Sequence, residues 1–427
     1  MKLRDIHPNI KLRLGIQFLG GLVSMAVIPF LAIYFSKKIG AAETGIILIL
    51  TVISGVIGGF IGGHVSDKIG RRSIMIYSEI GVLVTYLLIA FCNSPWYDLP
   101  YVSAVFFVFN MFAGGMLQPA AQAMIIDVTD TESRKLVFTI SYWLGNLATA
   151  LGGIMGAFLF KSYLFELFIG ISAISLLSVV ITFFFISETY TPAPVKPSTG
   201  KRKSSRFDFL KSYSAVIKDR LFMFYIVGAV FIFTLEQSLT NYIGIRLERD
   251  IPEQGATLLG LDFTIDGTKV LGFLKTENTL LVVLLSAVVL YLFKKWKDKW
   301  NLVTGMFIFS VSFSALAFIS NIWILFILIF VGTIGELMYV PVKQAMIGEL
   351  APSNARSTYM AFYSLTFYGA MIIASLLIIV GEWISPVMMG GILLILGLTG
   401  TCLYYLITRS LEGREAVTGE MKSSVPS

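Results

Sequence analysis

The sequence predicts an all-α integral membrane protein in which twelve transmembrane helices form two parallel six-helix repeats. Three observations predict this fold: an apolar composition, a series of long apolar runs and an internal repeat. Of the 427 residues, 56% are hydrophobic and 14% are charged, and the mean hydropathy is +0.80. A soluble domain carries about 25% charged residues, so this chain cannot cover a folded surface with polar groups. The composition excludes a large water-soluble catalytic domain.

Twelve apolar runs are separated by turn or charge clusters. A spanning helix takes about 20 residues, and these runs are too long for barrel strands. Because backbone groups in hydrocarbon must be satisfied within their own segment, each run is predicted to be a helix. The runs cover residues 13–36, 41–64, 72–93, 100–127, 136–160, 164–187, 220–243, 278–295, 301–319, 323–348, 357–380 and 385–408.

Lys and Arg residues gather on one face of this arrangement. With both termini cytoplasmic, 25 of the 33 fall on the cytoplasmic side, Arg13 among them. This bias predicts a multi-pass protein of the cell membrane with cytoplasmic termini. The net charge of +7 then reflects topology and anionic lipid. The expected partners are the bilayer, protons and small lipophilic substrates, with no nucleic acid, and the chain is expected to be a monomer.

A polar stretch at 188–219 divides the chain. It is enriched in Pro, Ser and Lys, as flexible linkers are. We therefore expect an N-terminal six-helix half at 1–187, a cytoplasmic linker, and a C-terminal half at 220–427 that ends in a short cytoplasmic tail.

A second polar stretch, at 244–277, is expected on the external side. Asp266-Gly267 stands between alternating apolar residues, a pattern typical of a two-residue hairpin turn. The sequence predicts an external β-hairpin at about 260–274, either as a lid or as an ornament.

An internal repeat relates the two halves. PAAQAMIIDVTDTESRK from Pro119 aligns without gaps to PVKQAMIGELAPSNARS from Pro341, at an offset of 222 residues. The repeat makes the fourth helix equivalent to the tenth. Parallel halves of this kind, with a site between them near the midplane, are typical of alternating-access transporters.

The connection between the second and third helices reads GHVSDKIGRR. This pattern resembles the signature loop of the major facilitator superfamily. Glycines there permit a tight turn and close helix approach, and Asp67 can cap or attract the N-terminus of a neighbouring helix. The resemblance implies that Arg71 pairs with Asp127, at the end of the fourth helix. The alternative is that the basic residues only satisfy the charge bias. The candidate conformational residues are Gly63, Asp67, Gly70, Arg71 and Arg72.

Helices four and five add to the resemblance and also depart from it. The fifth helix, YWLGNLATALGGIMG, is glycine-rich like that of drug/proton antiporters, but lacks their Gly-Pro pair. Close packing explains these glycines equally well. In the fourth helix, Asn110 stands where the resemblance implies a membrane-embedded Arg.

Three blocks resemble the multidrug/proton antiporter branch of the superfamily, of the lactococcal multidrug resistance type. They are LRLGIQFLG (12–20), AMIIDVTDTESRKLVF (123–138) and TIGELMYVPVKQ (333–344). The resemblance implies functional carboxylates at Asp67, Asp127, Glu236 and Glu336. One further acid of that group falls on Ser141.

The residues alone also single out Glu236 and Glu336, because both lie inside apolar runs. A charge at the bilayer centre costs about 2.5–3.5 kcal/mol, so such residues usually face a cavity. They could exchange a proton for a cationic substrate, or be hydrogen-bonded structural groups. For Glu79, in the third helix, a lipid-edge or packing role is expected.

Lys343 lies two helical turns after Glu336, about 10 Å away. Three roles fit: snorkelling to the cytoplasm, pairing with an acid, or binding an anionic substrate group. Tyr142, Trp143 and Tyr339 could stack on flat cations or serve ordinary packing.

These features predict a proton-coupled secondary transporter that exports lipophilic, often cationic drugs by alternating access. The alternative is a proton-coupled transporter of one metabolite class, such as a peptide, sugar or lipid. Enzyme and ATP-binding motifs are missing from the sequence, so an ion gradient is the expected energy source. No cofactor or metal is expected, since the chain has two histidines. Proton stoichiometry, sodium use and transport direction stay open.

Overall fold

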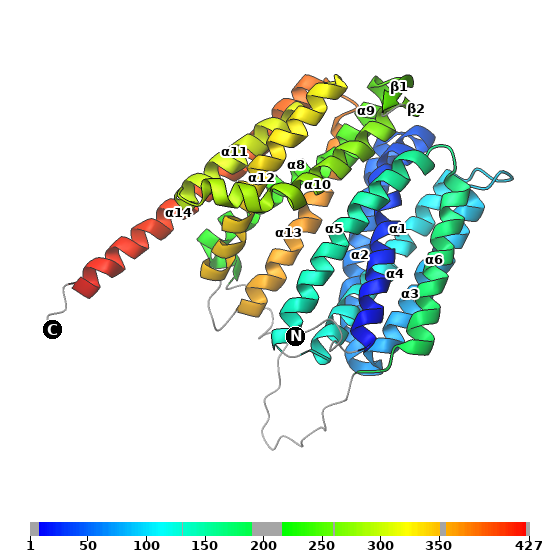
Figure 1. Ribbon diagram of the computed structural model, residues 1–427, viewed down its shortest axis with the longest axis horizontal. Coiled ribbons are helices and arrows are strands. Elements are labelled where there is room, and N and C mark those ends of the chain that lie inside the picture. Colours follow the sequence, from blue (N-terminus) through cyan, green and yellow to red (C-terminus); the bar gives the residue numbers. More distant parts are fainter. Residues whose placement is uncertain (1–7, 130, 190–215, 259–260, 351–355, 424–427) are drawn as a thin grey trace, which may run out of the picture. The chain divides into compact units, whose positions relative to one another are not determined.

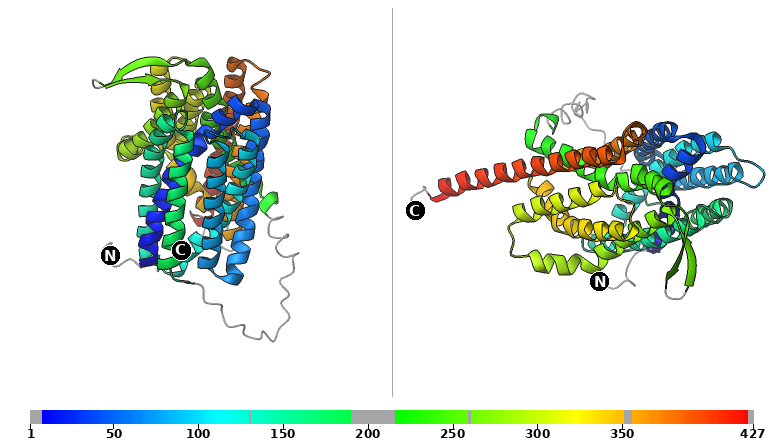
Figure 2. Two further views of the ribbon diagram at one scale, coloured as in Figure 1. Left: turned by 90° about the vertical axis from the view of Figure 1, so that its right-hand side faces the viewer. Right: turned by 90° about the horizontal axis from the view of Figure 1, so that it is seen from above.

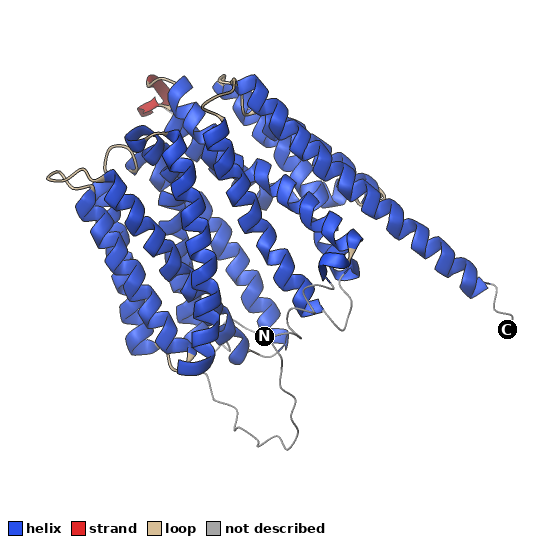
Figure 3. Cartoon of the chain, turned by 180° about the vertical axis from the view of Figure 1, so that it is seen from behind, coloured by secondary structure: helices blue, strands red, loops and turns tan. Residues whose placement is uncertain are grey.

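A computed structural model describes residues 8–129, 131–189, 216–258, 261–350 and 356–423. The predicted fold class is confirmed, because helices make up almost all of these residues and the strands form one small hairpin (Figure 3). In this part of the chain ten helices are long and apolar enough to cross a membrane. Helices α5 and α11 complete the twelve predicted segments.

Six helices make up the first half of the chain and pack as a bundle (Figure 1). Helix α2 packs on α4, α1 on α5, and α3 on both α4 and α6. Small residues permit the tightest of these contacts, since a Cβ at Gly58 would lie 2.2 Å from the Phe112 carbonyl oxygen. The helices are α1 (Pro8–Ile39), α2 (Ala41–Ile69), α3 (Arg71–Cys92), α4 (Pro100–Asp127), α5 (Thr131–Leu159) and α6 (Leu164–Phe185).

The second half begins with a helix that changes its winding. Helix α8 passes through the π-helical turn η2 into the short α9, a local unwinding often found at functional sites. Helix α8 packs on α14, and α11 packs on both α12 and α14. The elements are α8 (Arg220–Ser238), η2 (Leu239–Ile243), α9 (Gly244–Asp250), α10 (Gly267–Phe293), α11 (Asp298–Ala315), α12 (Ile322–Leu350), α13 (Arg356–Val380) and α14 (Pro386–Ser423).

The chain forms two compact units. The N-terminal unit comprises Met1–Lys196, Thr240–Thr279 and Ser375–Trp383, and the C-terminal unit comprises the remaining residues. The N-terminal unit therefore takes in two segments from beyond the predicted linker. Most of that linker, residues 190–215, lies outside the described residues.

The hairpin occurs earlier in the chain than predicted. Strand β1 (Gln254–Leu258) pairs antiparallel with β2 (Leu261–Ile265). Both strands belong to the N-terminal unit and directly follow α9 in the chain (Figure 2). Asp266-Gly267 is not its turn: the Asp266 carboxylate accepts a hydrogen bond from the Lys269 backbone N–H, at 2.9 Å, and caps α10. The prediction of a hairpin at 260–274 is wrong because Asp is favoured both in tight turns and as a helix cap.

Candidate functional site

Three charged side chains lie within the membrane-spanning helices of the C-terminal unit. Glu236 is near the end of α8, while Glu336 and Lys343 lie two turns apart on α12. Lys343 is 2% exposed, and its Nζ lies 4.0 Å from the centre of the Phe233 ring. Such an ammonium is stabilised by the negative face of the ring. Of the roles predicted for Lys343, snorkelling into water does not occur in this structure.

Both acids act on this lysine. Glu236 and Glu336 are half-buried and attract the Lys343 ammonium electrostatically. Tyr339 is 1% exposed and interacts electrostatically with the same two carboxylates. The centre of its ring lies 5.5 Å from Lys343 Nζ. The structure therefore gathers four of the predicted site residues into one cluster of two carboxylates, an ammonium and a phenol.

Close helix packing holds this cluster in place. A Cβ at Gly335 would lie 2.6 Å from the Gly305 carbonyl oxygen, so only glycine lets α11 approach α12 beside Glu336. The Tyr225 hydroxyl donates to the Lys343 carbonyl oxygen at 2.9 Å, and the Tyr404 hydroxyl donates to the Tyr225 carbonyl oxygen at 3.2 Å. The backbone around Lys343 is therefore tied to α8 and α14.

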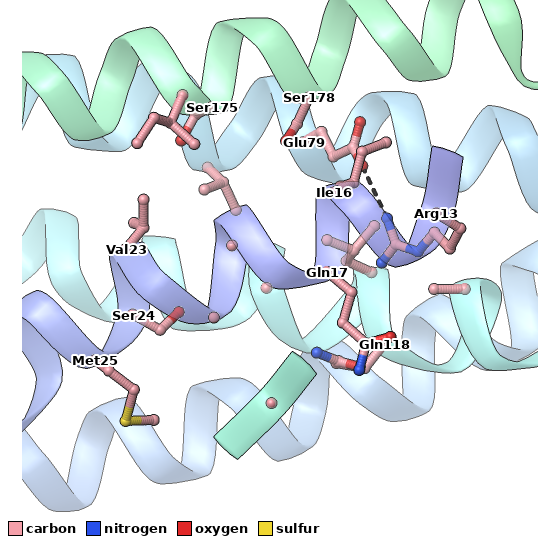
Figure 4. A pocket seen from close by; sticks show the side chains of 18 of the residues that line it. Arg13, Ile16, Gln17, Val23, Ser24, Met25, Glu79, Gln118, Ser175 and Ser178 are labelled. Atoms are coloured by element: carbon pink, nitrogen blue, oxygen red, sulfur yellow. Dashed lines mark hydrogen bonds and ion pairs between the residues drawn. The ribbon is translucent and has the colours of Figure 1, made fainter. Parts of the chain in front are cut away.

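A cavity of about 500 Å³ lies inside the N-terminal unit, with walls from α1, α3, α4, α5 and α6. Arg13 and Glu79 are the charged side chains among its lining residues. Arg13 Nη1 donates to Glu79 Oε1 at 3.2 Å (Figure 4). The cavity wall thus carries a buried ion pair.

The sequence did not predict this pair. Of the two roles expected for Glu79, the lipid-edge role is wrong because the residue is 3% exposed, while the packing role is compatible with its burial. Arg13 was counted with the cytoplasmic charges, but α1 already begins at Pro8, and Arg13 is 5% exposed on its second turn. The physical reason is that burial of a paired acid and base costs less free energy than burial of either charge alone.

The remaining predicted residues of this half fall in different places. Asn110 borders the cavity, is 2% exposed, and donates from Nδ2 to Thr85 Oγ1 at 2.8 Å, which ties α4 to α3. Ser141 also lines the cavity. The Trp143 side chain is 68% exposed and does not line this cavity. The Tyr142 side chain lies outside the described residues.

The signature loop has the geometry of a tight, capped helix junction. Gly70 has a φ of +101°, which favours glycine, and a Cβ there would lie 2.3 Å from Glu188 Oε2. The Glu188 carboxylate accepts hydrogen bonds at 3.0 Å from the backbone N–H groups of Arg71 and Arg72, at the start of α3. Glu188, which the sequence placed in the linker, thus occupies the capping place considered for Asp67, whose side chain lies outside the described residues.

The same loop approaches the end of α4. Arg71 Nε lies 3.5 Å from Asp127 Oδ2, so the expected pair is present. Arg72 donates to the Phe183 carbonyl oxygen on α6. Gly63 faces Pro119 on α4, where a Cβ would lie 3.6 Å from the Pro119 Cβ. The loop therefore connects the ends of α2, α3, α4 and α6.

A second charged network lies at the opposite end of the N-terminal unit. Lys37, in the last turn of α1, pairs with Glu248 on α9, and Lys161, after α5, lies 2.7 Å from Asp266. The hydrogen bond to Asp266 raises the pKa of Lys161. Burial acts to raise the pKa of Asp266, but the hydrogen bonds from Lys161 and the Lys269 backbone hold it below its ordinary value of 3.8. This network fastens the hairpin region to α1 and α5.

No group of three or more His, Cys, Asp or Glu side chains arranged to hold a metal occurs in the described ranges. Transition metals and Zn²⁺ favour such clusters. The N-terminal cavity instead offers one carboxylate with hydroxyls and amides, and the C-terminal cluster offers two carboxylates with an ammonium and a phenol.

The family model of the Major Facilitator Superfamily matches residues 14–265 and 259–426. The model thus matches twice along the chain, and the first match runs past the predicted linker to residue 265. The chain belongs to the major facilitator superfamily and is a multi-pass membrane transporter, not an enzyme.

Two curated relatives extend over most of the chain. A Na(+), Li(+), K(+)/H(+) antiporter of Planococcus maritimus is 32% identical over 90% of this chain and 92% of its own length. The multidrug resistance protein MdtH of Cronobacter sakazakii is 23% identical over 81% of this chain and 80% of its own.

Among solved structures, a peptide transporter POT in complex with sulfate superimposes with a TM-score of 0.70. The superposition covers 94% of this chain and 96% of that one, at 16% sequence identity. This likeness supports the fold alone.

Proposed function

We propose that the protein is a proton-coupled antiporter that exports cations by alternating access. The observation that carries this proposal is the buried Lys343 beside Glu236 and Glu336. Charged groups in membrane segments are costly and usually mark ion or proton pathways. Among the described residues, two carboxylates lie around this one ammonium, so the cluster can take up a proton. Uptake of a proton here, coupled to release of a cation elsewhere in the protein, gives the simplest basis for exchange.

Monovalent inorganic cations are the favoured cargo. The relative from Planococcus maritimus is named for Na⁺, Li⁺ and K⁺ exchange with H⁺. The N-terminal cavity supports this choice, since its lining offers many neutral oxygen atoms and one aromatic side chain, Tyr86. Hard cations take oxygen ligands, whereas flat organic cations favour aromatic faces.

Lipophilic cationic drugs are the second candidate cargo. The relatives named as multidrug resistance proteins favour it. Aliphatic side chains also line part of the N-terminal cavity, as broad drug recognition requires. Tyr339, beside Lys343, would then supply an aromatic surface.

The signature loop is proposed to control the conformational cycle. Arg71 and Asp127 would pair in one state and separate in the other, on a face that the charge bias assigns to the cytoplasm. Both termini are proposed to lie on that face of the plasma membrane. A single chain is proposed to be sufficient, since each buried cluster is built within one unit.

Liposomes with an acidic lumen and an enclosed pH dye test this proposal. Addition of NaCl, KCl or LiCl to liposomes that contain the purified protein should make the lumen alkaline. Glu236→Gln and Glu336→Gln should abolish the response. Glu382→Gln, which alters an exposed carboxylate, should preserve it.

The outcomes separate the candidates. A response to ethidium without any response to the three salts would favour drug export. A wild-type protein that responds to neither class, or Glu→Gln variants that respond normally, would contradict proton-coupled cation export.

A further inference from the structure

The buried pair of Arg13 and Glu79 has no part in the proton site proposed above. It lies in the other unit, on α1 and α3, and both side chains face the same cavity (Figure 4). Burial of an ion pair generally stabilises a protein less than well-packed apolar residues of similar volume. Its position on a cavity wall therefore points to a role beyond stability.

The pair is incompletely satisfied among the described residues. Glu79 Oε1 accepts from Arg13, whereas Glu79 Oε2 is buried and accepts no hydrogen bond of ordinary geometry, although the Thr182 hydroxyl interacts with this carboxylate. Arg13 Nε is buried and unpartnered as well. An ionised carboxylate has about four acceptor positions, so the free oxygen of Glu79 retains most of its capacity to bind a cation.

The surrounding cavity supplies neutral oxygen atoms. Gln17, Gln118 and Ser178 line the same cavity as Arg13 and Glu79 (Figure 4). Ser175 lines the same wall of α6. One carboxylate with hydroxyl and amide oxygens is the donor set that a hard cation of low charge prefers.

Arg13 gives this site an unusual property. A guanidinium keeps its charge at any pH that proteins experience, so it cannot leave Glu79 by losing a proton. It can only be displaced by another cation. Arg13 therefore occupies the place that a bound cation would take.

We infer that Glu79 is the anchoring ligand of a monovalent inorganic cation site in the N-terminal unit, and that the cation displaces Arg13. This inference rests on the proposed function and deepens it by placing the cargo in the N-terminal cavity. Ser178 and the amide side chains at the wall supply the neutral ligands.

Binding of ²²Na⁺ to the purified protein, measured by scintillation proximity, tests the site without transport. Glu79→Gln should weaken binding by about tenfold or more, since it removes the charge and keeps the shape. Arg13→Gln should tighten binding, because it removes the competitor. Glu166→Gln, an exposed acid on α6, is the matched control and should bind as wild type does.

Two further variants separate a binding role from a structural one. Arg13→Gln combined with Glu79→Gln leaves no charged side chain on the wall of this cavity, so the variant should fold and still fail to bind. Glu79→Asp keeps the charge but shortens its reach, so it should change the order of affinity for Li⁺, Na⁺ and K⁺. A purely structural pair would not alter that order.

The result that overturns the inference is wild-type ²²Na⁺ affinity in Glu79→Gln, or equal losses in Glu79→Gln and Arg13→Gln. Transport by the wild type in liposomes separates the two proposals. If the wild type still exchanges cations for protons, only the Glu79 site is wrong and the proposed function stands. If the wild type exchanges nothing, the proposed function fails instead.

Discussion

The two halves of the molecule bury their charges in different ways. In the N-terminal unit one acid meets one base, Glu79 and Arg13, at 3.2 Å. In the C-terminal unit two acids share Lys343, whose ammonium lies over an aromatic ring. The first arrangement is neutral and its base cannot titrate. The second places two carboxylates around one ammonium among the described residues, so it can take up a proton. We propose that the first arrangement binds the cation and the second exchanges the proton.

The internal repeat sharpens this contrast. With the offset of 222 residues, Glu336 corresponds to Gly114, and Lys343 corresponds to Ala121. Gly114 and Ala121 both line the N-terminal cavity. Helices α4 and α12 are therefore equivalent in the repeat, but at the matched positions α4 has small residues that line a cavity and α12 has charged residues. The halves share a scaffold and differ in chemistry.

Removal of the shared base should give the largest effect. Lys343→Gln leaves two carboxylates with no buried ammonium beside them, so the charge balance of the cluster is lost and exchange should stop. Cation-driven alkalinisation of the liposome lumen should fall to background, while the exposed control Lys297→Gln should respond normally. Normal activity in Lys343→Gln would break the assignment of proton exchange to this cluster.

The signature-loop pair should give a smaller effect of another kind. Arg71→Gln removes the contact with Asp127 but touches neither buried cluster. We expect the initial rate of exchange to fall several-fold while ²²Na⁺ affinity stays at the wild-type value. Arg409→Gln, on an exposed part of α14, is the control. A change in affinity that matches the change in rate would contradict a purely conformational role.

Two glycine substitutions test whether α4 and α12, which are equivalent in the repeat, pack equally tightly against their neighbours. A Cβ at Gly335 meets the Gly305 carbonyl oxygen at 2.6 Å, whereas a Cβ at Gly114 meets nothing within 4 Å. Gly335→Ala should lower the free energy of unfolding by about 1–3 kcal/mol through overpacking. Gly114→Ala should change it by less than about 0.5 kcal/mol. Thermal unfolding of the two purified variants provides the measurement, and equal shifts would contradict the contrast.

The smallest effect is expected at the charged network outside the membrane. The pKa of Asp266 is held below 3.8, so its ion pair with Lys161 stabilises the fold above that pH and is lost as the pH falls through the folded-state value. The raised pKa of Lys161 preserves the pair up to pH 10.5 and beyond.

Asp266→Asn should therefore lower the unfolding temperature by a constant amount between about pH 5 and pH 9, and by less below about pH 4. The loss should stay under about 1 kcal/mol, because the Lys161 end is exposed and screened. A loss that grows in acid would have the wrong sign.

Sequence predicted the helices well because apolar length alone decides which segments span a membrane. It also identified Glu336 and Lys343, since a charge in the middle of an apolar run is conspicuous. Arg13 and Glu79 were harder. Arg13 stands at the start of its run, where the positive-inside bias explains it, and only tertiary packing brings Glu79 beside it.

Two other misses have local causes. The Asp266-Gly267 pair fits a hairpin turn and a helix start equally well, and the contact of Asp266 with Lys161 lies 105 residues away in sequence. Glu188 follows α6 in a polar stretch, and nothing in that stretch indicates that it caps α3.

The central claim is that the N-terminal half binds the cation and the C-terminal half exchanges the proton. Its most direct test compares ²²Na⁺/Na⁺ exchange with Na⁺/H⁺ exchange in the same liposomes for Glu336→Gln and Glu79→Gln. The amide at 336 mimics a protonated acid, so Glu336→Gln should retain ²²Na⁺/Na⁺ exchange and lose Na⁺/H⁺ exchange, whereas Glu79→Gln should lose both. Loss of both activities in each variant, or retention of both in either, would contradict the division.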